Sequence, residues 1–292
     1  MNSDEILQII GKSNFAIGLG GYNHDDFDND CEIYNLLIFD GKNKSDEIIQ
    51  HESKIFKISH ENLSESNSEN LINFSNIQII NDEQWDLKIL LSKIEERKNS
   101  LFQTSAKNAL VDSQLAISKA KHSLENNDPF VSCWTKCSSL FLIDSILLEN
   151  QLLPRPTQAL SYLRNLEQKN TNQFIDKIIF EIGTERVTPS LLSRMLKSTI
   201  GFSDMIEQNH NSMIIEKKAN HLIQNSLLSD CYLYLSYQNR NNFYKIQDSL
   251  NKNSDKIHVL KIAFDLSNAI SESSQSINSL SEITKSLLNH YH

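Results

Sequence analysis

Near the N-terminus, two glycines and two carboxylates have the spacing that a phosphate and a metal ion would need. Gly20-Gly21 follows one apolar run, and Asp30-Cys31-Glu32 precedes the next, Ile33-Tyr34-Asn35-Leu36-Leu37-Ile38-Phe39. Two glycines at the end of a strand leave backbone N–H groups uncovered, which suits a phosphate. Carboxylates at positions i and i+2 of a strand point to one face, where their oxygens could hold a Mg²⁺ ion that bridges a triphosphate.

Apolar periodicity indicates the elements that must position these residues. Strands are expected at 16–19, 32–39, 54–59 and 77–80, after a short capped helix at 4–12. From Leu87 onward the apolar residues recur with helical spacing, and the strand signals stop. The pattern predicts an α+β fold, with a mixed-sheet domain at 1–95 and a mostly helical domain at 96–292. The core of a helical bundle is expected at about 105–170, with further helices to the C-terminus.

The composition of the chain supports a mostly helical, soluble protein. Its 292 residues include 7 Gly and 4 Pro, fewer than sheets and loops usually require. A net charge of −9 disfavours a general surface for polyanions, although it allows a local basic groove. No apolar stretch reaches the roughly 18 residues of a membrane span, and the first residues contain no basic signal-peptide region. We therefore expect a cytoplasmic protein without a membrane partner.

The four cysteines form neither a disulfide framework nor a paired C-x-x-C metal site. Cys133 and Cys137 lie one helical turn apart, so they could bind one metal ion together. The alternative is that both are buried thiols on an apolar helix face. In the same half of the chain, the cluster Tyr232, Tyr234 and Tyr237 is expected to pack in a core rather than to stack on bases, because the chain is acidic.

The order of a strand, Gly-Gly, a loop and Asp-x-Glu before a second strand resembles the nucleotidyltransferase fold of the DNA polymerase β superfamily. That pattern is a hydrophobic residue, Gly, Gly or Ser, a spacer of about ten residues, and Asp-hydrophobic-Asp/Glu-hydrophobic. Leu19-Gly20-Gly21 and Asp30-Cys31-Glu32-Ile33 match it here, with Asn29 where many members have Ser. The resemblance covers roughly residues 1–95.

This resemblance implies a role for each matched residue. Gly20 and Gly21 would bind the β- and γ-phosphates of a nucleoside triphosphate, and Asp30 and Glu32 would hold two Mg²⁺ ions. An acceptor hydroxyl would attack the α-phosphate, and pyrophosphate would leave. The acceptor could be a small molecule, a protein or an RNA end. The alternative is that these residues have no binding role: they would form a polar loop that leads into an amphipathic strand, with solvated carboxylates.

The chain departs from the family pattern at the third carboxylate, which in the family lies on a later strand. The expected strand at 54–59 carries Lys57 or Ser59 at the corresponding positions. Four acids lie around or beyond that strand, and none of them lies within an expected strand in a clear hydrophobic-Asp-hydrophobic setting: Glu52, Glu61, Asp82 and Asp86. A protonated lysine can neutralise phosphate but cannot bind Mg²⁺. A catalytically degenerate domain that binds a nucleotide or a partner protein is therefore the alternative to a transferase.

The helical half resembles the bundles found beside such domains, of the kanamycin-nucleotidyltransferase and HEPN (higher eukaryotes and prokaryotes nucleotide-binding) types. A long apolar helix at 130–150, a link that contains prolines and a helix at 158–166 carry this resemblance. No arginine has a histidine at the HEPN ribonuclease spacing, so the sequence does not support a ribonuclease. The bundle could instead close over the nucleotide, bind the acceptor or form a homodimer. Its arginines could line a cleft that faces the glycines or could be solvated and ion-paired: Arg155, Arg164, Arg186 and Arg194.

Overall fold

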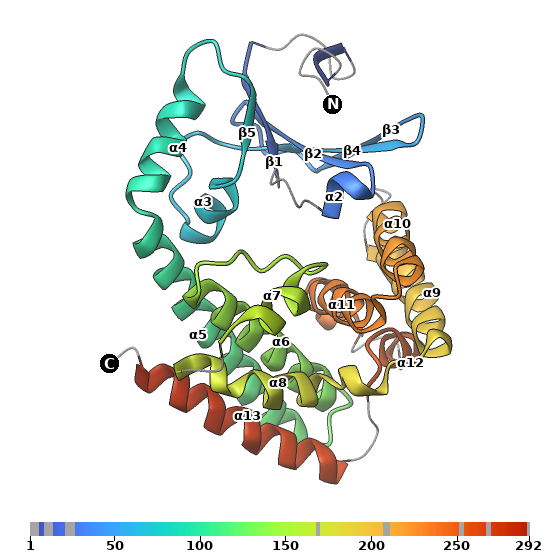
Figure 1. Cartoon of the computed structure of the whole chain (residues 1–292). Coiled ribbons are helices and arrows are strands. Elements are labelled where there is room, and N and C mark those ends of the chain that lie inside the picture. Colours follow the sequence, from blue (N-terminus) through green and yellow to red (C-terminus); the bar gives the residue numbers. More distant parts are fainter. Residues whose placement is uncertain are drawn as a thin grey trace. The chain divides into compact units, whose positions relative to one another are not determined.

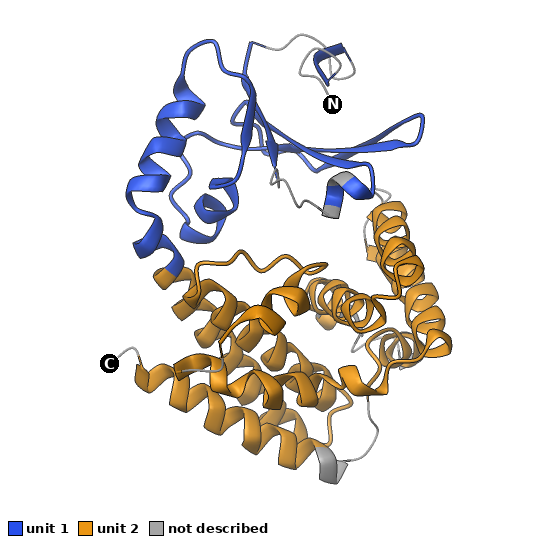
Figure 2. Ribbon diagram, viewed as in Figure 1, with its two compact units in different colours: residues 1–102 blue, residues 103–292 orange. Residues whose placement is uncertain are grey.

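The computed structural model describes residues 6–8, 14–20, 27–167, 170–206, 211–250, 254–266 and 270–290, with the backbone alone at 27, 29, 248–250, 254–255 and 270–272. The chain divides into two compact units, unit 1 at residues 1–102 and unit 2 at residues 103–292 (Figure 2). The boundary predicted between residues 95 and 96 falls at the end of helix α4, Asp86–Glu96. Most of the helix predicted at 4–12 lies outside the described residues.

Unit 1 contains a five-stranded mixed sheet in the order β3-β4-β2-β1-β5 (Figure 1). Strand β2 pairs with β1 in antiparallel orientation and with β4 in parallel orientation, while β3 and β5 pair antiparallel at the two edges. The strands are β1 Ala16–Gly20, β2 Ile33–Phe39, β3 Glu47–His51, β4 Lys54–His60 and β5 Gln78–Asn81. This sheet confirms the α+β class for the N-terminal part of the chain.

Apolar side chains cover both faces of this sheet, because alternate residues of each strand point to opposite sides. One face carries a cluster that includes Leu36 and Phe56, and the Phe56 ring stacks on Tyr34 with centroids 5.3 Å apart. On the other face, Phe39 meets Phe74 of helix α3, Ser68–Phe74, edge to face at 5.4 Å. Helix α3 therefore packs on this second face, at the Phe39 end of β2.

Strand β3 was missed by the sequence prediction. It has only two apolar residues, Ile48 and Ile49, and it lies at the sheet edge with β4 as its single partner. An edge strand needs less apolar surface than a central one, so its sequence signal is weak. The other expected strands, in contrast, form within two residues of their predicted limits.

Unit 2 is helical throughout its described part. Helix α5, Lys98–Glu125, enters it from unit 1 and is followed by the central helix α6, Val131–Glu149. The remaining elements are α7 Ala159–Asn165, η1 Asn170–Phe174, α8 Ile175–Ile182, η2 Thr184–Arg186, α9 Pro189–Ile206, α10 Asn211–Gln224, α11 Leu228–Leu250, α12 Ser254–Ala263 and α13 Ile270–His290. This unit confirms the prediction of a mostly helical C-terminal part.

Helix α6 is the core helix of unit 2. It is also the one described helix that is long and apolar enough to cross a membrane, but 78% of its apolar window is buried in the protein. Just before its start, Asp128 Oδ1 accepts a hydrogen bond of 2.8 Å from the Phe130 N–H. Cys133 and Cys137 are both buried in this helix, and burial raises the pKa of Cys137 to about 12. The structure thus agrees with the prediction of buried thiols.

A buried charged group joins α6 to α11. Asp144 accepts hydrogen bonds of 2.6 Å from both the Tyr237 hydroxyl and the Arg240 guanidinium. The guanidinium also lies over the rings of Phe141 and Tyr237, at 4.5 and 4.7 Å from their centroids. Burial, and then the charge of Asp144, raise the pKa of Tyr237, so this tyrosine stays a neutral hydrogen-bond donor.

Replacement of one member of this buried pair should destabilise the protein strongly. Asp144→Leu leaves the Arg240 guanidinium buried without its carboxylate, which should lower the free energy of unfolding by about 3–5 kcal/mol. The double variant Asp144→Leu, Arg240→Met removes both charges and should recover most of that loss. Urea denaturation followed by far-UV circular dichroism measures both effects. A single variant that loses less than about 1 kcal/mol would show that the pair is not effectively buried.

Candidate functional site

The predicted phosphate-binding glycines lie at the end of β1. Gly20 is the last residue of this strand and is partly exposed, while Gly21 lies outside the described residues. A Cβ atom at Gly20 would lie 3.4 Å from Leu37 Cδ1 and 3.6 Å from the Asn35 carbonyl oxygen. A side chain at this position would therefore contact the neighbouring strand β2.

The prediction that Asp30 and Glu32 share one face of a strand is wrong. Asp30 is the exposed last residue of a short helix, α2 Phe27–Asp30, and strand β2 starts only at Ile33. Glu32 lies in the turn between them with a left-handed φ of 53°. A left-handed residue is a common way for a helix to end. Because both carboxylates lie before β2 begins, the regular alternation of side chains along a strand does not place them on one face.

Glu32 is bound instead to the turn between β3 and β4. Its Oε1 accepts a hydrogen bond of 3.1 Å from the Ser53 hydroxyl, and its carbonyl oxygen accepts one of 2.9 Å from the Ile55 N–H. These bonds fix the start of the parallel pairing between β2 and β4. The Glu32 carboxylate therefore holds the β3–β4 turn against the start of β2.

The strand that was expected to carry a third carboxylate carries a lysine. In the parallel pairing of β2 with β4, Asn35 is opposite Lys57, so both side chains point to the same face of the sheet. The Lys57 ammonium forms a 2.7 Å ion pair with Asp46, and both side chains are about one-third exposed, 30% and 36%. Lys57, one of the two residues considered for this position together with Ser59, is therefore held by an acid on this face of the sheet.

The other acids that were considered for this role lie elsewhere. Glu52 is in the β3–β4 turn, and Glu61 follows the end of β4. Asp82 caps α4, because its carboxylate accepts hydrogen bonds of 3.3 and 2.9 Å from the N–H groups of Leu87 and Lys88. In the described part of the chain, no three side chains of His, Cys, Asp or Glu are grouped to hold a metal ion. The two predicted Mg²⁺ ions therefore remain a prediction.

Three residues form a row across the sheet, from β1 through β2 to β4. Gly20 is opposite Asn35, and Asn35 is opposite Lys57, so the row combines a glycine without a side chain, an amide and an ammonium. The Asn35 amide donates a 2.9 Å hydrogen bond to Asp28 of α2, which orients it. Hydrogen-bond donors and a cation on one face are suited to an anion.

Sequence analysis did not identify Asn35 or Asp46 as parts of this site. The available signal was Asn35 itself, a single amide in the middle of the apolar run Ile33–Phe39. Two of the four arginines considered in the helical half have acidic partners within unit 2: Arg164 binds Asp230 at 3.1 Å, and Arg186 binds Asp265 at 3.3 Å. The expectation that Tyr232, Tyr234 and Tyr237 pack in a core is confirmed, since all three are buried.

A scan against family models finds no match to this chain, and a search of curated proteins finds no relative. The site must therefore be interpreted from its own geometry.

The charge of Lys57 acts on the neighbouring Glu61. Burial raises the pKa of Glu61, the charges of Asp46 and Glu65 raise it further, and Lys57 lowers it. Lys57→Met should therefore move the Glu61 pKa upward, because the ionised carboxylate loses an attractive charge and Asp46 loses its ion-pair partner. NMR titration of the Glu61 side-chain carboxyl measures the shift. The control is Lys54→Met on the opposite face of β4, which should leave this pKa unchanged, and a fall in the Lys57 variant would contradict the assignment.

Proposed function

We propose that unit 1 is a nucleotidyltransferase-like domain that binds the phosphate groups of a nucleotide without transferring them. The observation that carries this proposal is the position of Lys57 opposite Asn35, where transfer chemistry would require a carboxylate. Two metal ions stabilise the attacking and leaving oxygens in such reactions. A lysine at this position supplies positive charge to the phosphates directly. It also replaces the carboxylate that would bind the metal ion next to the acceptor hydroxyl.

The geometry of the row supports phosphate as the anion. Phosphate oxygens accept hydrogen bonds from backbone N–H groups at the glycine end of the row and a charged hydrogen bond from Lys57 at the other end. The ammonium must exchange Asp46 for the ligand, and this exchange is inexpensive because a partly exposed ion pair contributes at most about 1 kcal/mol. Asp28 holds the Asn35 amide between the two ends.

The proposed ligand is a nucleoside triphosphate or diphosphate, and the proposed location is the cytoplasm. A metal-dependent transferase that uses Asp30 and Glu32 is the competing function, with a small molecule, a protein or an RNA end as the acceptor. That function requires the two carboxylates to converge on metal ions when the nucleotide binds. The two functions differ in their dependence on Mg²⁺ and in the variants that abolish binding.

Titration of the full chain with ATP, in Mg²⁺ or in EDTA, tests the proposal. Lys57→Met should weaken binding about tenfold, the effect of losing about 1.4 kcal/mol of interaction. The control Lys54→Met, which changes a lysine on the opposite face of the same strand, should bind like the wild type. The double variant Asp30→Asn, Glu32→Gln should also bind like the wild type, with or without Mg²⁺.

Other outcomes would overturn the proposal. Binding that requires Mg²⁺ and disappears in the Asp30→Asn, Glu32→Gln variant would support the transferase, and pyrophosphate release by the wild type would establish it. Absence of ATP binding by the wild type, or equal binding by the Lys57 and Lys54 variants, would remove the nucleotide site from this face of the sheet.

A further inference from the structure

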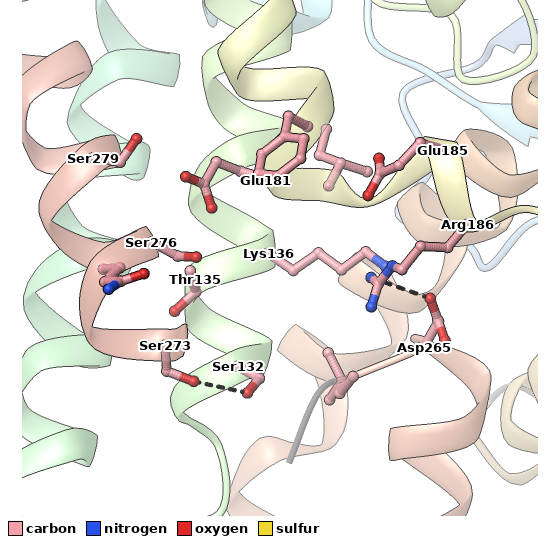
Figure 3. Close-up of a pocket in the computed structure, with 14 residues that line it drawn as sticks. Ser132, Thr135, Lys136, Glu181, Glu185, Arg186, Asp265, Ser273, Ser276 and Ser279 are labelled. Atoms are coloured by element: carbon pink, nitrogen blue, oxygen red, sulfur yellow. Dashed lines mark hydrogen bonds and ion pairs between the residues drawn. The ribbon is translucent and has the colours of Figure 1, made fainter. Parts of the chain in front are cut away.

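Unit 2 contains a pocket of about 530 Å³ (Figure 3). Residues of α6, α8, η2 and α13 line it, together with Asp265 and Leu266, which follow α12. This volume lies within the range of small-molecule sites. All of its lining residues belong to unit 2, so an argument about this pocket does not rest on the nucleotide proposal.

A buried lysine, Lys136 of α6, lines this pocket. It is only 5% exposed, and its ammonium donates hydrogen bonds of 2.8 Å to the Tyr232 hydroxyl and 2.7 Å to the Phe264 carbonyl oxygen. A charged ammonium has three hydrogens to donate, so these two bonds leave one donor for an acceptor in the pocket. A buried charge without enough acceptors is costly, which favours a ligand that supplies one.

A second cation, Arg186 of η2, lies on the side of the pocket toward which Lys136 extends in Figure 3. Its guanidinium binds Asp265 at 3.3 Å, and Asp265 also accepts a 2.7 Å hydrogen bond from the Tyr232 hydroxyl. Asp265 therefore balances one of the two cations. Lys136 provides the remaining positive charge on this side.

Two further acids line the pocket, Glu181 at the end of α8 and Glu185 in η2. Figure 3 shows both on the rim above Lys136 in this view. The opposite wall is rich in hydroxyls, which are contributed by two turns of α6 and by a face of α13 with residues at i, i+3 and i+6: Ser132, Thr135, Ser273, Ser276 and Ser279. Ser132 and Ser273 lie 3.5 Å apart and link the two helices.

We propose that this pocket binds a small zwitterion of the amino-acid type, with its carboxylate at Lys136 and Arg186 and its ammonium at Glu181 and Glu185. A phosphate or another polyanion would be repelled by the two glutamates, while a simple amine would leave the third donor of Lys136 unmatched. A ligand with one charge of each sign satisfies both sets of groups. The hydroxyl wall then faces the remainder of the ligand and accepts a polar side chain.

The ionisation of Lys136 provides a signature of carboxylate binding. Burial lowers the pKa of Lys136 to about 7, while the charge of Asp265 raises it and the charge of Arg186 lowers it. A bound carboxylate stabilises the ammonium and so raises this pKa, which means that binding takes up a proton above pH 7. Affinity should therefore be highest below pH 7 and should fall, by up to about tenfold for each pH unit, as pH rises above 7.

Calorimetric titration of the full chain tests the proposal with the standard amino acids, each supplied separately. For every amino acid that binds, the probes are its analogue without the amine and its analogue without the carboxylate. We expect the amino acid to bind at least about tenfold more tightly than either analogue. Titrations in buffers of different ionisation enthalpy should show proton uptake above pH 7 and little below it.

Two variants and a control complete the experiment. Lys136→Met should abolish proton uptake and weaken binding about tenfold. Lys136→Met also removes a buried contact and could destabilise the protein, so the double variant Glu181→Gln, Glu185→Gln provides a second test. In this rim variant, the affinity for the amino acid should fall to about the affinity for its amine-free analogue. The control Lys119→Met, which changes an exposed lysine of α5 that lies 4.2 Å over the Trp134 ring, should bind like the wild type.

The zwitterion site would be overturned by three results. These are no binding of any amino acid at millimolar concentration, equal binding of the amine-free analogue, and an unchanged affinity in the rim variant. None of these results bears on ATP binding by unit 1, so failure of this proposal and failure of the nucleotide site are distinguishable.

Discussion

The parallel pairing of β2 with β4 determines the chemistry of unit 1. This pairing starts at the bond from the Ile55 N–H to the Glu32 carbonyl oxygen, and it sets Asn35 opposite Lys57. A shift of one residue would turn the lysine to the face that holds Leu36 and Phe56, where a charge would be buried among apolar groups. The apolar core therefore fixes the register, and the register places a cation in the same row as Gly20, with Asn35 of β2 between them.

In unit 2, buried charged groups determine how two of the helices pack. Its central helix α6 is apolar enough to cross a membrane, yet it carries Lys136 and Asp144 within the protein core. Each of these charges has partners on α11, Tyr232 for the lysine and Tyr237 and Arg240 for the aspartate. Since buried charges are tolerated only when paired, these contacts specify how the two helices pack. The lysine differs from the aspartate in that it also lines a pocket.

The sequence predicts the parts of this fold that depend on local apolar periodicity. Strands β1, β2 and β4 and helix α6 have strong patterns and form close to their expected limits. Strand β3 was missed because an edge strand needs little apolar surface. The arrangement of Asp30 and Glu32 was wrong because one left-handed residue, Glu32, interrupts the regular geometry that a spacing argument assumes.

The candidate sites depend on contacts that local patterns do not contain. Lys57 could be identified, together with Ser59, as a candidate for the third-carboxylate position, but its pairing with Asp46 and its register with Asn35 come from the folded sheet. The pocket of unit 2 combines Lys136 with Arg186 and Asp265, which are separated by many turns of helix along the chain. No short motif contains these three residues, so sequence spacing gives no signal for that site.

The most direct test of the nucleotide-binding account is an NMR titration of the isotope-labelled full chain with ATP in the presence of EDTA. The account predicts that the backbone amide of Gly20, the side-chain amide of Asn35 and the ammonium of Lys57 shift together and saturate with one dissociation constant. Addition of Mg²⁺ should not change which residues respond. Shifts that occur only with Mg²⁺ and centre on Asp30 and Glu32, or a titration that leaves unit 1 unperturbed, would contradict the account.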